Sequence, residues 1–114
     1  MDEHTTFAAI RKRVSDFRDE RDWLKDNTPK NLAISITVEA AELLDHFQWK
    51  TDDQVREALN DKTKKKEVSD EFADVLILCL SFSDVMGIDI SEAIEAKLCK
   101  AAGKYPATKT SLRP

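Results

Sequence analysis

Glycine, proline and cysteine are scarce in this sequence, with two, three and two residues respectively among 114. Folds built from β-sheets need many tight turns, and glycine and proline occupy many of those positions. The scarcity therefore favours long helices joined by short connections, and we predict an all-α fold. A chain of this length suits one domain with a thin core, so we predict a single domain over residues 1–114.

Long apolar runs and an excess of basic residues are also lacking. The longest uncharged stretch, Val75–Ser83, has nine residues, whereas a membrane-spanning helix needs about 20. The acidic start of the chain does not resemble a signal peptide. The net charge of −4 disfavours binding of a nucleic-acid polymer. These features predict a cytoplasmic protein that binds neither membrane nor nucleic-acid polymer, with Cys79 and Cys99 reduced and packed in the core.

Hydrophobic periodicity and capping residues predict four main helices and one short helix. The expected ranges are about Thr6–Lys25, Pro29–Trp49, Thr51–Leu59, Lys66–Met86 and Asp89–Gly103, followed by an extended tail from about Lys104. Thr28 is a good N-cap for the second main helix, with Pro29 at its first position. Gly87 is the expected C-cap of the third main helix.

Four acidic residues stand out because of the helix faces on which they lie. Glu39 and Glu42 are spaced i,i+3 in the second main helix, and Glu71 and Asp74 have the same spacing in the third. A projection at about 100° per residue places both pairs on the apolar side of their helices, whereas Asp84 falls on the outer side. Burying an unpaired carboxylate is costly, and clustering four of them is more so.

A divalent cation would relieve this conflict, and so would nearby basic side chains. Carboxylate oxygens without matching histidine or cysteine ligands suit Mg²⁺ or Mn²⁺. The alternative is that buried ion pairs with Arg18, Arg21, Lys97 or Lys100 neutralise the four acids. Position and spacing alone leave both interpretations open. A di-iron site is disfavoured, because it requires Glu-x-x-His in two helices.

The sequence around the four acids resembles a known family. The segments EAAE (39–42) and EFAD (71–74) resemble the E-x-x-E and E-x-x-D signature of the MazG-like, all-α NTP pyrophosphohydrolases. Further segments are similar to the dCTP-pyrophosphatase-like branch, namely FRDERDW (17–23), PKNLA (29–33), FQWKTD (47–52), ADVLI (73–77) and KYP (104–106). The resemblance implies a four-helix-bundle-type fold that assembles as a homodimer or homotetramer.

The resemblance also implies an activity, the Mg²⁺-dependent hydrolysis of a nucleoside triphosphate to a monophosphate and pyrophosphate. The expected substrate is dCTP or a non-standard deoxynucleotide, and the expected role is house-cleaning of the nucleotide pool. Glu39, Glu42, Glu71 and Asp74 match the Mg²⁺ ligands of the family, with Glu39 or Glu42 as the catalytic base. The positions implied in substrate binding are Trp23, Lys30, Asn31, Trp49, Lys97 and Lys104.

Two alternatives stand beside this reading. One is a non-catalytic helical interaction or regulatory module, in which basic side chains pair the acids and no metal binds. The other keeps the fold and changes the substrate to dUTP or phosphoribosyl-ATP. Asn27, Leu78 and Ala101 replace the histidine, tyrosine and asparagine that are frequent in the family, and these departures bear on base and sugar preference.

The third main helix carries an independent signal for self-association. It is apolar almost all round from Val75 to Val85. Such a helix needs cover on every side, and one chain offers at most three other main helices. The sequence therefore predicts at least a homodimer.

Overall fold

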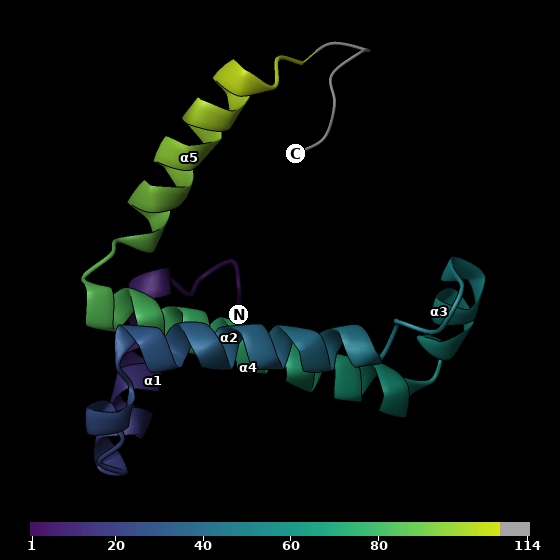
Figure 1. The fold of residues 1–114 in the computed structure, drawn as a ribbon, viewed down its shortest axis with the longest axis horizontal. Coiled ribbons are helices and arrows are strands. Elements are labelled where there is room, and N and C mark those ends of the chain that lie inside the picture. The colour runs from purple at the N-terminus through teal and green to yellow at the C-terminus, as the bar shows by residue number, and fades with distance from the viewer. Residues whose placement is uncertain (108–114) are drawn as a thin grey trace.

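The structure, a computed structural model, describes residues 1–107 and is all-α over that range. It contains α1 (Phe7–Glu20), the 3₁₀ turn η1 (Leu24–Asp26), α2 (Pro29–Asp45), α3 (Asp52–Ala58), α4 (Lys62–Met86) and α5 (Ile90–Lys104). No strand occurs among these residues, so the predicted fold class is confirmed. Helices α2 and α4 lie side by side in opposite directions, with α1 crossing near one end and α3 joining them at the other (Figure 1).

Capping side chains define where the helices begin and end. The Thr28 hydroxyl accepts a hydrogen bond from the backbone N–H of Asn31, and Pro29 follows it at the first helical position. Thr51 and Gln54 form a reciprocal capping box at the start of α3. Gly87 ends α4 in the left-handed conformation, with φ of 66°, which glycine adopts without strain. The predicted caps at Thr28 and Gly87 are confirmed.

Two predicted helices end earlier than expected. Helix α1 stops at Glu20 rather than near Lys25, because the chain turns at Asp22, whose φ of 56° is left-handed. Helix α2 stops at Asp45 rather than Trp49, because the following backbone tightens into hydrogen bonds between residues three apart.

Helix α4 begins earlier than predicted, at Lys62 instead of Lys66. The side chain of Asp61 accepts a hydrogen bond from the backbone N–H of Thr63 and so caps the helix within the expected loop. Helix α5 continues to Lys104, and residues 105–107 of the predicted tail are not helical, whereas residues 108–114 lie outside the described residues.

A buried arginine holds α1 to α4. Arg18 is only 6% exposed, and its Nη1 donates a hydrogen bond of 2.8 Å to Asp84 Oδ2, while its Nε donates one of 2.9 Å to Asp19 Oδ1. These bonds, that with Asp19 foremost, raise the pKa of Arg18. Asp84 therefore faces α1, and its predicted place on the outer side of the helix is wrong.

The single chain is open, and few side chains are fully buried. Leu32 and Leu80 are the buried apolar residues among those described. The radius of gyration of 17.2 Å exceeds the value of about 13 Å expected for a compact chain of this length. Helix α5 projects away from the α2–α4 pair (Figure 1), and every residue from 91 to 100 is exposed. One chain therefore does not close four helices around a common core.

The two cysteines differ in environment. Cys79 is half-buried in α4, whereas Cys99 is exposed on α5, and neither forms a disulfide. The predicted core position of Cys99 is therefore wrong in the single chain, because α5 packs against no other helix there.

A candidate metal site between two helices

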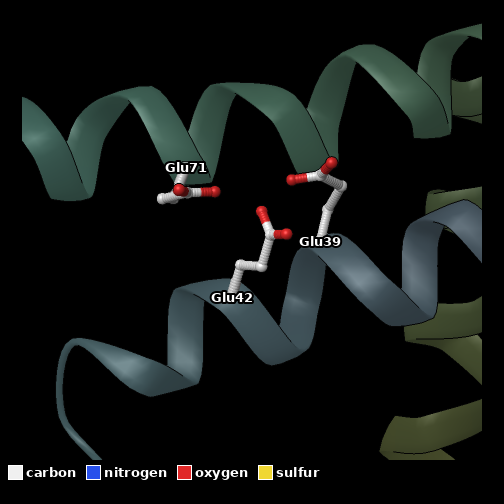
Figure 2. A group of neighbouring side chains, drawn as sticks. All are labelled: Glu39, Glu42 and Glu71. Atoms are coloured by element: carbon white, nitrogen blue, oxygen red, sulfur yellow. The ribbon is translucent and has the colours of Figure 1, made fainter.

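Three glutamates meet between α2 and α4. Glu39, Glu42 and Glu71 each contribute one carboxylate oxygen to a group whose members all lie within 4.8 Å of one another. Figure 2 shows the Glu42 carboxylate reaching from α2 into the space between Glu39 and Glu71, with Glu71 coming from α4. The structure thus brings together three of the four acids expected from the sequence.

Apolar packing between the two helices forces these acids to face one another. The inward side of α2 repeats every three or four residues, and its buried or half-buried members are Leu32, Ser35, Ile36, Glu39, Leu43 and His46. On α4 the half-buried Glu71 lies between Val68 and Val75, one turn from each. Packing the apolar members of both stripes therefore carries Glu39 and Glu71 into the same interface.

The three glutamates of the cluster lack ion-pair partners among the described residues. Glu39 Oε2 and Glu71 Oε2 are buried and have no hydrogen-bond partner. Unpartnered carboxylate oxygens from several side chains form the hard donor set that Mg²⁺ and Mn²⁺ prefer, so the residues present fit such an ion.

The pKa values of Glu39 and Glu71 are both raised above the usual value of a glutamate. A hydrogen bond with Glu42 is the main cause of the raised pKa of Glu39, and burial and the neighbouring carboxylates add to it. Burial is the main cause of the raised pKa of Glu71, with the charges of Glu42 and Asp74 acting in the same direction and His46 opposing them. Both carboxyl groups thus hold protons more tightly than isolated glutamates, as expected for carboxyl groups that lie close together without a cation.

Basic residues that could have paired the cluster are engaged or distant. Arg18 binds Asp19 and Asp84. The Arg21 guanidinium lies 3.4 Å from the centre of the Phe17 ring. Lys97 and Lys100 lie on α5, which points away from α2 and α4 (Figure 1). The buried ion pairs of the alternative interpretation are absent from the described part of this chain.

Asp74, the fourth predicted ligand, lies at the edge of the cluster. It is exposed on α4 and falls outside the group of oxygens within 4.8 Å. Its charge nevertheless raises the pKa of both Glu39 and Glu71, so it shares their electrostatic environment.

The residues implied in substrate binding lie mainly on the surface. Trp23 and Trp49 are 48% and 86% exposed, and Trp23 contacts Phe17 edge to face. Asn31 Nδ2 donates a hydrogen bond to the carbonyl of Asp26. Among residues 1–107, none of the six forms a hydrogen bond or ion pair with the three glutamates; the six are Trp23, Lys30, Asn31, Trp49, Lys97 and Lys104.

His46 and Lys64, for which no role is predicted from the sequence, contact one another between α2 and α4. His46 Nδ1 is 3.0 Å from the Lys64 ammonium. His46 follows Glu39 by seven residues and Lys64 precedes Glu71 by seven, so both lie on the helix faces that carry the acids. This seven-residue spacing is the feature of the sequence that could have identified His46 and Lys64.

The chain belongs to the MazG-like family, whose family model matches residues 34–112. Among curated relatives, dCTP pyrophosphatase 1 of Homo sapiens is 30% identical over 102 residues, covering 90% of this chain and 60% of the relative. The Bos taurus protein of the same name is 28% identical over 101 residues, covering 89% and 60%. The chain thus spans about 60% of the length of these curated relatives.

A solved structure supports the same fold. The crystal structure of a pyrophosphatase from Archaeoglobus fulgidus is 45% identical, with a TM-score of 0.82, and the match covers 90% of this chain and 94% of that one. The family resemblance predicted from the sequence is confirmed.

Proposed function

We propose that this protein is an Mg²⁺-dependent pyrophosphohydrolase that cleaves a deoxynucleoside triphosphate into a monophosphate and pyrophosphate. The observation that carries the proposal is the meeting of three glutamates with two buried, unpartnered oxygens. The names of the relatives, dCTP pyrophosphatase 1 and a pyrophosphatase, support it and favour dCTP or a non-standard deoxynucleotide as substrate. House-cleaning of the nucleotide pool is the corresponding role.

The glutamates have two tasks in this proposal. Glu39, Glu42 and Glu71 would hold Mg²⁺, or Mn²⁺ in its place, with Asp74 as a further ligand at the edge. The ion, when bound, supplies positive charge to the triphosphate oxygens and to the charge that develops at the α-phosphorus. Glu39 or Glu42 accepts the proton of the water that attacks this phosphorus.

The remaining predicted residues recognise the nucleotide. The exposed indole faces of Trp23 and Trp49 suit stacking on a base. Lys30 and Asn31 lie at the N-terminus of α2, where anions are favoured. We propose that Lys97 and Lys104 reach the phosphates of a nucleotide bound to a neighbouring copy, since α5 points away from its own cluster (Figure 1).

Self-association completes the proposed enzyme as a homodimer or homotetramer. Large apolar side chains are exposed on three helices, namely Ile34, Val38 and Leu44 on α2, Phe72, Leu76 and Ile77 on α4, and Ile94 and Leu98 on α5. Exposure on this scale is unusual for a monomer and marks a protein interface. The large radius of gyration agrees with a chain whose core is finished by another copy.

We further propose that residues 1–114 act as one domain in the cytoplasm. Among residues 1–107, no helix combines the length and apolar character needed to cross a bilayer.

The test is a substrate panel with and without Mg²⁺. Pyrophosphate release is measured from the standard nucleoside triphosphates, dUTP, modified deoxycytidine triphosphates and phosphoribosyl-ATP. We expect Mg²⁺-dependent release, fastest with dCTP or a modified relative. Release only from dUTP or phosphoribosyl-ATP would move the substrate within the family, and no release from any compound would favour the interaction module.

The matched variant is Glu42→Gln, which keeps the size of the side chain and removes its charge. We expect activity to fall by about 100-fold or more while the variant still melts cooperatively. A fully active Glu42→Gln enzyme would exclude this residue as a metal ligand or base.

A further inference from the structure

The His46–Lys64 contact lies at one end of the acidic cluster. His46 follows Asp45, the last residue of α2, and Lys64 lies in the first turn of α4. The two helices run in opposite directions, so these residues continue the facing stripes of Glu42 and Glu71 (Figure 1). Lys64 lies about 10 Å from Glu71 along the helix axis, a separation that a chain of phosphate groups can span.

The lysine is held in place rather than free in solvent. Its side chain is 28% exposed, and its ammonium group lies 3.0 Å from His46 Nδ1 and 3.7 Å from Glu67 Oε2. A protonated lysine can only donate, so Nδ1 accepts this hydrogen bond and the ring nitrogen Nε2 carries the proton. Holding a long side chain in one orientation beforehand reduces the entropy lost on binding a ligand.

The ammonium group keeps capacity for a ligand. It has three N–H donors, of which one is directed to His46 and another is drawn towards Glu67. The other lysines of this stretch differ, since Lys66 is 74% exposed and pairs with Asp70 on the helix surface. Lys64 is thus a half-buried cation held beside a group of carboxylates that lacks a counter-ion.

We propose that Lys64, positioned by His46, binds a phosphate oxygen of the nucleotide at the acidic cluster. This inference rests on the proposed function, because the cluster must first attract the phosphates through its metal. Lys64 is then a substrate-binding residue and His46 is a positioning residue. The oxygen belongs either to the α-phosphate, which stays with the monophosphate product, or to the phosphates that leave as pyrophosphate.

The experiment compares Lys64→Met with Lys66→Met, which removes the same charge from the exposed side of the same helix. Methionine keeps the apolar stem of lysine, so its packing is retained. For Lys64→Met we expect KM for dCTP to rise about tenfold, which corresponds to loss of one charge-assisted hydrogen bond. Lys66→Met should stay within about twofold of wild type.

Product inhibition then locates the phosphate. A weaker inhibition by pyrophosphate alone assigns the contact to the leaving group, and a weaker inhibition by dCMP alone assigns it to the α-phosphate. Lys64→Arg should recover most of the affinity, because it restores the charge and donors. His46→Leu should also raise KM for dCTP. His46→Gln keeps a hydrogen-bond acceptor for Lys64 and should therefore raise KM less.

Failure of this inference is separable from failure of the proposed function. If the wild type hydrolyses dNTPs but Lys64→Met and Lys66→Met have the same KM and the same inhibition by both products, Lys64 binds no phosphate. If the wild type hydrolyses nothing, the proposed function fails, and calorimetric titration of wild type and Lys64→Met with pyrophosphate and Mg²⁺ decides the phosphate contact alone. Lys64→Gln replaces the methionine variant if the latter does not fold.

Discussion

Replacement of Arg18 by methionine tests how α1 is held on the pair of helices that carries the site. The side chain is nearly fully buried and donates to carboxylates on both α1 and α4. Methionine fills part of the same volume and removes both hydrogen bonds and the charge. Asp84 would then lose its partner, and α1 would keep few specific contacts with α4.

The expected loss follows from the surroundings of the two acceptors. Hydrogen bonds to charged groups contribute about 1.5–3 kcal/mol each. Asp19 and Asp84 are 54% and 36% exposed, so water replaces part of each lost bond. We therefore expect a loss of about 2–3 kcal/mol in the free energy of unfolding. For a domain of this size that is a fall of roughly 10–20 °C in Tm.

Thermal and urea unfolding at fixed protein concentration measure the loss. The control is Lys12→Met, which removes a cation from the same helix but breaks only the exposed Lys12–Asp16 pair. That control should melt within about 2 °C of wild type, because exposed ion pairs contribute little. An Arg18→Met protein that melted like the control would refute the assignment of this arginine as the main tie between α1 and α4.

Two further outcomes follow from the site and the exposed faces. The pKa values of Glu39 and Glu71 are raised above 4.5 in the folded chain, so the folded chain binds protons at these groups more tightly than the unfolded chain does. These two groups therefore stabilise the fold fully below pH 4.5, and their contribution is lost as the pH rises through the folded-state pKa. The Tm of the metal-free protein should therefore fall as the pH rises through this window. Mg²⁺ should raise the Tm of the wild type at pH 7 but not that of Glu39→Gln, and an equal effect of Mg²⁺ on both proteins would contradict the proposed site. Leu76 on α4 is 46% exposed, and Leu76→Glu places a charge at that position. This variant should have a lower molar mass than wild type in sedimentation, and an unchanged mass would exclude this face of α4 from the proposed interface.

The inward faces of α2 and α4 could be predicted from sequence because periodicity is local. Glu39 and Glu71 are half-buried and have half-buried apolar neighbours within one turn, as Val68 and Val75 are for Glu71. A helical projection needs no knowledge of other helices to find such a face. The meeting of Glu39 with Glu71 then required only that the two apolar stripes pack together.

Other features depended on residues far away in sequence or on single backbone angles. The projection of one helix places Asp84 on the outer side, but its partner Arg18 lies 66 residues away in the sequence and is invisible to such a projection. The early end of α1 depends on the left-handed conformation of Asp22, which its residue type permits but does not require. Asp61 falls in a polar stretch between two predicted helices, and aspartate is typical both of such loops and of helix N-caps.

The position of α5 shows what the pattern of one chain cannot specify. Ile90, Ile94 and Leu98 recur at intervals of four residues and predict an apolar face, but not the surface that covers it. In the single chain Ile90 is half-buried near the start of α1, whereas Ile94 and Leu98 stay exposed, so most of this face forms without the partner that its pattern predicts. Closure of a four-helix bundle would therefore require the self-association proposed above.

The open core and the acidic cluster have a common physical origin. Glu39 and Glu71 occupy positions in the α2–α4 interface where aliphatic side chains would otherwise pack, so the two helices give up apolar burial to bring carboxylates together. In a chain this short, little other core remains to offset that loss. The opposite side of α4 exposes Phe72, Leu76 and Ile77, whose burial would add apolar contacts. Under the proposed function, metal binding on one face of α4 and self-association on the other would therefore both stabilise a helix pair that its own chain leaves incomplete.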